Sequence, residues 1–303
     1  MINLRYHIVS LAATFLAFGL GILAGTTVID QGLVSSLRQN TSALERDLNE
    51  AHASASDLQK QLDVWDQFGK AIQQPLLQGR LAGRAVVVVV DAKTPGSLLS
   101  KLDEAFRFAG AKRTTRITLT PRWSLDAPAP LEQLRQALGI AAADPDSALQ
   151  EAAARLGARL GGSADPRADG DPIRTLTDTG FLAMRDLPAR GPFPAANALV
   201  AVVSSGDPQQ VPAPDTFFVP LLKALSSSRV VAEAEPANAQ QSLAELVRAD
   251  GSLSRSICTV DHVDAFAGRL SLVYGLRDLA AGKVAQHYGV RSGATAVAPN
   301  LTS

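Results

Sequence analysis

The N-terminal part of the chain contains an apolar stretch that is long enough to cross a lipid bilayer. Between Tyr6 and Ile29 no residue carries a full charge at neutral pH, and only His7 can be partly protonated. A helix rises about 1.5 Å per residue, so roughly 20 residues cross the ~30 Å hydrocarbon layer. We therefore predict a transmembrane anchor over residues 8–29, preceded by a cytoplasmic stub over residues 1–7.

A cleaved signal peptide and a buried core helix are the alternatives for this stretch. A signal peptide has an apolar region of about 7–15 residues, followed by a small-x-small cleavage site. Here the apolar run is longer, the basic region before it is only Arg5, and residues 24–26 make a poor cleavage site. Arg5 precedes the span and Asp30 follows it, a distribution that favours a cytoplasmic N-terminus and an extracytoplasmic C-terminal domain.

Small residues recur at every fourth position of the predicted anchor, at Ala13, Ala17, Gly21 and Gly25. They share one stripe of the helix, where small side chains let two backbones approach closely, as in the Gly-x-x-x-Gly motif. Such spacings also arise by chance in spanning helices. The stripe is a candidate surface for self-association.

A second pattern follows the anchor, in a segment without glycine or proline between Gly32 and Gly69. Apolar and small residues are spaced alternately three and four apart, at Val34, Leu37, Thr41, Leu44, Leu48, Ala51, Ala55, Leu58, Leu62 and Trp65. This spacing marks the a and d positions of about four heptads. We predict a coiled coil over residues 33–69 and a parallel homodimer with the leucines as main contacts. A trimer, a different partner chain, and a helix lying on its own domain are the alternatives.

Short apolar runs alternate with helical patterns beyond residue 84. Residues 84–91 form a β-branched run typical of a strand buried on both faces of a parallel sheet. Further strands are predicted at residues 117–119, 198–203, 229–232 and 257–260, and helices at residues 97–110, 149–160, 217–226, 240–248 and 269–281. The alternation predicts a mostly parallel, doubly wound α/β domain with four or five strands over residues 84–303.

Composition and motifs limit which binding and catalytic functions are expected of this domain. The 29 basic and 29 acidic residues balance to a net charge of zero, which argues against a nucleic-acid-binding protein. The sequence has no glycine-rich phosphate loop, nucleophile elbow or His-Glu-x-x-His motif. Asp91 and residues 204–207 are expected at the switch point where open sheets bind ligands. We nevertheless expect no enzyme activity and no cofactor.

The densest polar cluster lies at residues 261–264, with the sequence Asp-His-Val-Asp. It is either a weak metal site, an acid–base pair, or a turn in which Asp261 or Asp264 caps backbone amides near the last helix. We favour the turn.

Three segments resemble the actinobacterial MctB family, also called SteB in corynebacteria: residues 1–13, 259–264 and 268–279. The order of anchor, rod, valine-rich strand and C-terminal signature covers nearly the whole chain, although residues 120–195 resemble the family only loosely. The resemblance implies a cell-envelope protein, described either as a copper transporter of the outer membrane or as a septum protein with a cytoplasmic partner. It implies no catalytic residues.

Copper(I) prefers thiolate and thioether ligands, and imidazole also binds copper. The only cysteine is Cys258, the only methionines are Met1 and Met184, and the histidines are scattered. A direct copper site would need Cys258 together with His262. We therefore expect a non-enzymatic, membrane-anchored envelope protein that acts through self-association and docking of an envelope or division partner. A component of copper transport or homeostasis is the alternative.

Overall fold

The computed structural model describes residues 4–301, except for the side chains of residues 4–5 and 26–35. The chain divides into two compact units at the boundary between Trp65 and Asp66. We describe each unit by itself.

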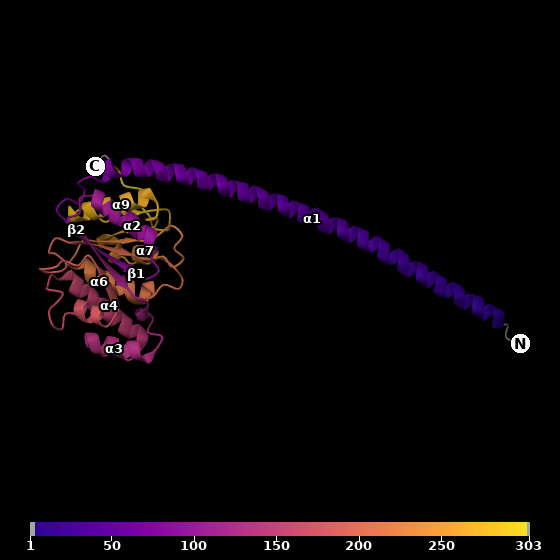
Figure 1. Ribbon diagram of the computed structural model, residues 1–303, viewed down its shortest axis with the longest axis horizontal. Helices are drawn as coiled ribbons and strands as arrows, with labels where there is room; N and C mark the ends of the chain where they lie inside the picture. Colours follow the sequence, from indigo (N-terminus) through magenta and orange to yellow (C-terminus); the bar gives the residue numbers. More distant parts are fainter. Residues whose placement is uncertain (1–3, 302–303) are drawn as a thin grey trace. The chain divides into compact units, whose positions relative to one another are not determined.

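One helix, α1 (Leu4–Leu77), makes up the described part of the first unit and enters the second (Figure 1). It continues past Gly69, where the sequence predicted the coiled coil to end, and includes Pro75 in its final turn. A proline removes one helical hydrogen bond and weakens a helix that stands alone. Here Leu77 is fully buried, so packing of the last turns offsets that loss.

The second unit is built on a seven-stranded sheet, with the order β3-β2-β1-β4-β5-β6-β7. The strands are β1 (Ala85–Asp91), β2 (Arg113–Leu119), β3 (Leu182–Arg185), β4 (Leu199–Val203), β5 (Val231–Ala234), β6 (Ile257–Val260) and β7 (His287–Tyr288). All neighbours pair in parallel except β2 and β3, which are antiparallel.

The prediction of a mostly parallel α/β sheet is confirmed. The predicted number of four or five strands is wrong, because the short edge strands β3 and β7 escaped notice.

Helices cover both faces of this sheet (Figure 1). The helices are α2 (Gly96–Phe108), α3 (Pro128–Leu138), α4 (Pro145–Gly161), α5 (Pro172–Asp178), α6 (Val219–Ser226), α7 (Leu243–Ala249), α8 (Leu253–Ser256) and α9 (Phe266–Ala280), with short helical turns at Pro121–Ser124 and Pro214–Phe218. Helices α2 and α9 pack on one face, and α3, α4 and α6 lie on the other.

The valine run of β1 supplies both cores at once. Val87 and Val89 belong to the cluster under α4 and α6, whereas Val86, Val88 and Val90 belong to the cluster under α2 and α9. Successive side chains of a strand point to opposite faces, so a central strand covered on both faces is apolar at every position. This arrangement explains why the run shows no alternation of polar and apolar residues.

The last turns of α1 belong to the second unit and pack against α9. A Cβ atom at Gly69 would lie 2.6 Å from Cγ of Phe266, so a larger residue could not fit without a shift. The hydroxyl of Tyr274 donates a hydrogen bond to the carbonyl of Leu76 at 3.2 Å. The end of α1 is therefore part of the folded domain.

Candidate functional site

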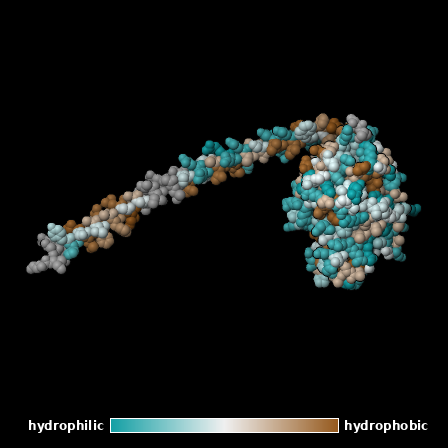
Figure 2. Space-filling view, turned by 180° about the vertical axis from the view of Figure 1, so that it is seen from behind, coloured by the Kyte–Doolittle hydropathy of each residue, from teal (hydrophilic) through white to brown (hydrophobic). Residues whose placement is uncertain are grey.

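The first candidate surface is the apolar stretch Tyr6–Gly25 of α1, with a mean hydropathy of 2.1 and no buried share. It is the one helical segment among the described residues that is long and apolar enough to cross a membrane. Figure 2 shows hydrophobic residues gathered along the N-terminal stretch of α1, while the α/β unit is mostly hydrophilic on the face in view. Ala13, Ala17 and Gly21 are exposed on this stretch, Gly25 is partly exposed, and a Cβ atom at Gly21 would meet nothing within 4 Å.

The second candidate surface is the heptad seam, which we define as Leu37, Leu44, Leu48, Leu58 and Leu62. All five leucines are exposed, from 55% for Leu37 to 68% for Leu44. Val34, which the sequence pattern also includes, lies outside the residues whose side chains are described. An apolar stripe of this extent usually marks a surface that another helix or a membrane covers. The pairing of two copies stays a prediction.

The third candidate lies at the carboxyl edge of the sheet, where the chain leaves β1 in one direction and β4 in the other. Asp91 is buried there and accepts hydrogen bonds from the backbone amides of Lys93 and Ser205, at 2.7 and 2.6 Å. Beside it is a cavity of about 340 Å³, lined by residues that include Lys93, Lys101 and Asp264. The prediction that Asp91 and the 204–207 turn meet at the switch point is confirmed. The carboxylate of Asp91 is occupied by backbone amides of the loop after β1 and the loop after β4. Its role here is therefore to join these two loops.

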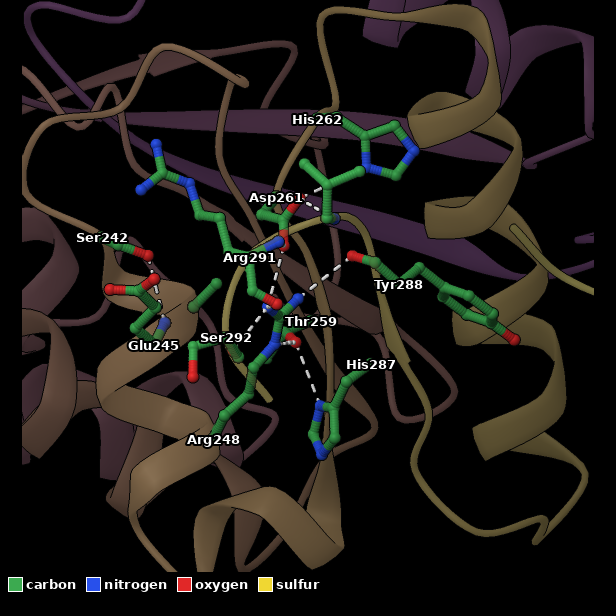
Figure 3. A network of polar contacts seen from close by, with 12 residues as sticks. Ser242, Glu245, Arg248, Thr259, Asp261, His262, His287, Tyr288, Arg291 and Ser292 are labelled. Carbon is green, nitrogen blue, oxygen red and sulfur yellow. Dashed lines mark hydrogen bonds and ion pairs between the residues drawn. The ribbon is translucent and has the colours of Figure 1, made fainter. Parts of the chain in front are cut away.

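A buried polar network lies further along the same edge (Figure 3). The guanidinium of Arg248 pairs with the carboxylate of Asp261 at 2.8 Å, and both side chains are almost completely buried. Arg248 also donates to the hydroxyl of Thr259 at 2.7 Å. The same hydroxyl lies 3.0 Å from Nδ1 of His287. The network thus ties α7, β6 and β7 together.

Asp261 also holds the C-terminal segment. It accepts hydrogen bonds from the backbone amides of Val290 and Arg291, at 2.9 and 3.0 Å. Burial alone would raise its pKa, but these amides and Arg248 outweigh burial and hold the pKa of Asp261 below its ordinary value. A Cβ atom at Gly289, whose φ is +143°, would overlap the carboxylate. Glycine at this position lets the backbone approach Asp261.

Two buried glutamates of β5 and its following loop lie near this network. Burial, with repulsion from Glu235, raises the pKa of Glu233 well above its ordinary value and so favours the protonated form of its carboxyl group. Neither carboxyl oxygen of Glu233 has a hydrogen-bond partner among residues 4–301. Burial likewise raises the pKa of Glu235, although Ser242 and the amides of Leu243 and Ala244 donate hydrogen bonds to it. These contacts fix the start of α7.

Residues 261–264 lie in the turn between β6 and α9, as predicted, but the amides that the two aspartates bind do not belong to the start of α9. Helix α9 begins after Ala265 without a side-chain cap. Asp261 instead binds the C-terminal segment, and Asp264 accepts a hydrogen bond from the amide of Ala237 at 2.8 Å. The aspartates do bind backbone amides, but of segments that are distant in the sequence.

Cys258 in β6 and His262 in the loop after it contact different parts of α9. Cys258 is fully buried, and a Cβ atom at Gly275 would lie 2.3 Å from its Sγ atom. The backbone carbonyl of His262 faces Gly268 instead. These two glycines are seven residues apart on α9, which corresponds to about 10 Å. Burial raises the pKa of the Cys258 thiol and lowers that of His262, whose ring nitrogens have no hydrogen-bond partner in the described chain. In residues 4–301 no group of three His, Cys, Asp or Glu side chains is arranged to hold a metal ion.

A known protein family matches almost the whole chain, including the apolar helix and the α/β unit. The family described as copper transport outer membrane protein, MctB, matches residues 1–299. The chain belongs to the MctB family. The resemblance seen in the sequence is therefore confirmed, and the family name together with the apolar helix indicates a membrane-anchored protein.

Relatives in the MctB family match the chain from end to end. The chain is 27% identical to a protein named copper transporter MctB from Mycobacterium tuberculosis, over 98% of this chain and 99% of that protein. Proteins of the same name from Mycobacterium bovis and Mycobacterium leprae match at the same identity and coverage.

The sequence did not reveal that Arg248, Arg291, Glu233 and Glu235 lie close to Asp261. A weak signal was present, since Glu233 directly follows the strand predicted at residues 229–232 and lies between two alanines. A carboxyl group next to a buried strand indicates a polar environment. The residues of that environment come from separate segments, which periodicity does not connect.

Proposed function

We propose that the protein is a non-enzymatic, membrane-anchored envelope component that self-associates along α1 and presents its α/β unit for docking of an envelope or division partner. The heptad seam carries this proposal. Its leucines are exposed in one copy of the chain, on a helix that continues from the apolar stretch. Two copies that pack along the seam remove these side chains from water, at about 25 cal/mol per Å² of apolar area.

The anchor favours a parallel arrangement of the two copies. Copies inserted in one membrane with the same orientation present their seams in the same direction and at the same height. Arg5 before the span and Asp30 after it favour an N-terminus in the cytoplasm and an extracytoplasmic α/β unit. A phosphatase reporter fused after Ser303 is expected to be active. Activity only of a cytoplasmic fluorescent reporter at that position would reverse this topology.

Replacement of seam leucines by charged residues tests the self-association. We expect Leu44→Glu with Leu48→Glu to convert the full-length protein in nanodiscs or mild detergent from a dimer to a monomer, because two charges per copy cannot be buried in the seam. Mass is measured by light scattering coupled to size-exclusion chromatography, with correction for the detergent or lipid.

The chain offers a matched control in the same stretch of helix. Ser42→Glu with Asn49→Glu adds the same charge at positions that follow Thr41 and Leu48 by one residue and point away from the a and d positions of the heptads. This control is expected to stay dimeric. A wild-type monomer, or a seam variant that keeps the wild-type mass, contradicts the proposal.

Copper transport is a second candidate function, which the family match favours. The thiol of Cys258 is buried, and its raised pKa keeps it protonated, whereas copper(I) binds the thiolate. We therefore propose that the protein serves copper transport through assembly with partners.

Copper tolerance of cells distinguishes a role in copper transport through assembly from a role through direct copper binding at Cys258. Cells with the Leu44→Glu and Leu48→Glu variant are expected to lose copper tolerance, while cells with Cys258→Ser keep it. Titration of the full-length protein with copper(I) should give the same result for wild type and Cys258→Ser. Tight copper(I) binding that Cys258→Ser abolishes would assign the role to a direct metal site.

A further inference from the structure

A second cavity opens at the amino edge of the sheet, on the face covered by α4 and α6. Its volume is about 380 Å³. The register pairs Ala85 with Arg113 and Val87 with Thr115. Paired residues and residues two apart point to the same face, so these four side chains form one wall of the cavity. The wall is apolar on β1 and cationic at the start of β2.

The loop before β4 forms the opposite wall of the cavity. Contacts with Ala164 and Arg159 hold this loop in place. Phe193 is buried, its amide donates to the carbonyl of Ala164 at 2.8 Å, and its carbonyl accepts from Arg159 at 2.7 Å. Arg159 is itself fixed by a buried pair with Asp171 at 2.5 Å. The backbone of Phe193 is therefore fixed at both its amide and its carbonyl.

Arg229 fixes the next turn of the same loop. Its guanidinium donates to the carbonyls of Ala195 and Ala196, at 2.8 and 2.7 Å, and to the carbonyl of Gly161 at 3.0 Å. Burial lowers the pKa of Arg229, and carbonyl dipoles take the place of the lost water. The cavity is thus preformed and does not require the loop to close over it.

The charges that line this cavity are all positive. Lys112, Arg113 and Arg190 line it, and no aspartate or glutamate does. None of the three forms an ion pair or a side-chain hydrogen bond within residues 4–301. The carboxylate of the nearby Asp186 lies 3.6 Å from Nε of Arg185, which is outside the lining.

We propose that this cavity binds a small amphipathic anion, which places a phosphate or carboxylate group between Lys112, Arg113 and Arg190 and its apolar part against Val87 and Phe193. Small-molecule sites are mostly apolar concavities with a few charged groups that fix orientation, and cavities of this size are typical. Guanidinium groups bind the oxygens of carboxylate and phosphate groups through paired hydrogen bonds.

Two sources offer the same chemistry, a lipid headgroup with its first methylenes and a water-soluble phosphate ester. Isothermal titration calorimetry of the full-length protein in phosphatidylcholine nanodiscs compares them, with empty nanodiscs subtracted. Hexyl phosphate represents the soluble ester, and dihexanoylphosphatidylglycerol represents the lipid. Inorganic phosphate and hexanol present the anion alone and the apolar part alone.

We expect one or both of the amphipathic anions to bind at one site per chain, and the tighter of them identifies the source. Inorganic phosphate should bind at least about tenfold more weakly, because it lacks the apolar contact. Hexanol should give no saturable heat. Binding of hexanol as tight as that of hexyl phosphate, or no saturable heat from either anion, overturns the proposal.

Charge-reversal variants of the cavity are the second part of this test. Arg113→Glu and Arg190→Glu are each expected to weaken binding about tenfold or more, since each removes a charge-assisted hydrogen bond. Arg255→Glu is the matched control, because Arg255 is an exposed arginine on α8 outside this cavity. It should bind like wild type. Unchanged affinity in both cavity variants, with circular dichroism confirming their fold, also overturns the proposal.

Discussion

Most leucine side chains of the α/β unit are buried, whereas those described in the first unit are exposed. Leu222 in α6 is completely buried between helices and sheet, whereas Leu62 in α1 is 62% exposed. In the α/β unit most large apolar side chains are covered by other parts of the same chain. In α1 before Asp66 the described large apolar side chains are exposed, so their burial depends on a membrane or on another molecule. The stability of the first unit is therefore a property of its assembly, and that of the second is a property of the chain itself.

The largest loss of stability is expected when a buried charge of the α/β unit loses its charged partner. Asp261→Ala leaves Arg248 buried without its partner and removes the acceptor of two backbone amides, so we expect a loss of about 3–5 kcal/mol in the free energy of unfolding. Urea unfolding followed by tryptophan fluorescence measures it. Asp169→Ala is the control, since that side chain is 99% exposed, and should cost less than about 1 kcal/mol. Equal losses in the two variants would contradict the structural role of the network.

One substitution made in both units tests the comparison directly. Leu222→Ala opens a cavity in a packed core and should lower the free energy of unfolding of the α/β unit by about 2–5 kcal/mol. Leu62→Ala should change that quantity by less than about 0.5 kcal/mol. It should instead weaken self-association, which sedimentation of the detergent-solubilised protein measures at several concentrations. A large loss of domain stability from Leu62→Ala would show that the first unit supports the second.

Protonation of Glu233 gives a smaller, pH-dependent effect. The folded state holds a proton that the unfolded chain releases near the ordinary pKa of 4.5, so the free energy of unfolding falls as pH rises above that value. The Glu233→Gln variant cannot lose this proton. Its stability relative to wild type should therefore increase with pH by up to about 1.4 kcal/mol per unit, until the pH passes the raised pKa. Urea unfolding of both proteins between about pH 5 and pH 8 measures the difference. A constant difference over this range would show that Glu233 is ionised in the fold.

The smallest effect is expected for surface charges on α1. Lys60 and Asp57 form an ion pair at 2.9 Å, with both side chains exposed. Lys60→Met should change helix stability by less than about 0.5 kcal/mol, as circular dichroism during thermal unfolding reports. A larger effect would place this pair in an interface rather than on an open surface.

Much of the fold could be predicted because its elements have strong local patterns. The valine run of β1 identified a central parallel strand, and β6 coincides with the predicted residues 257–260. The short strands at the sheet edges have only four and two residues, too few for a pattern of alternation. Helix α1 exceeded its predicted end because tertiary packing of Leu77 outweighed the signals of Gly69 and Pro75.

The candidate sites were predictable only where one segment carries them. The heptad seam follows from spacing along one helix, and Asp91 follows from its position after a strand. The network of Arg248 and Asp261, and the cavity beside Arg113, each join segments that are far apart in the sequence. Their members have no shared period or motif, so only the folded chain brings them together.

The contacts of Asp261 have a consequence for how the protein is made. Its backbone donors at Val290 and Arg291 follow it by 29 and 30 residues and are therefore synthesised after it. Until they emerge, a buried carboxylate lacks two of its partners, and the domain cannot reach its final stability. A chain cut short before Val290 would therefore keep the buried carboxylate and lose two of its backbone donors.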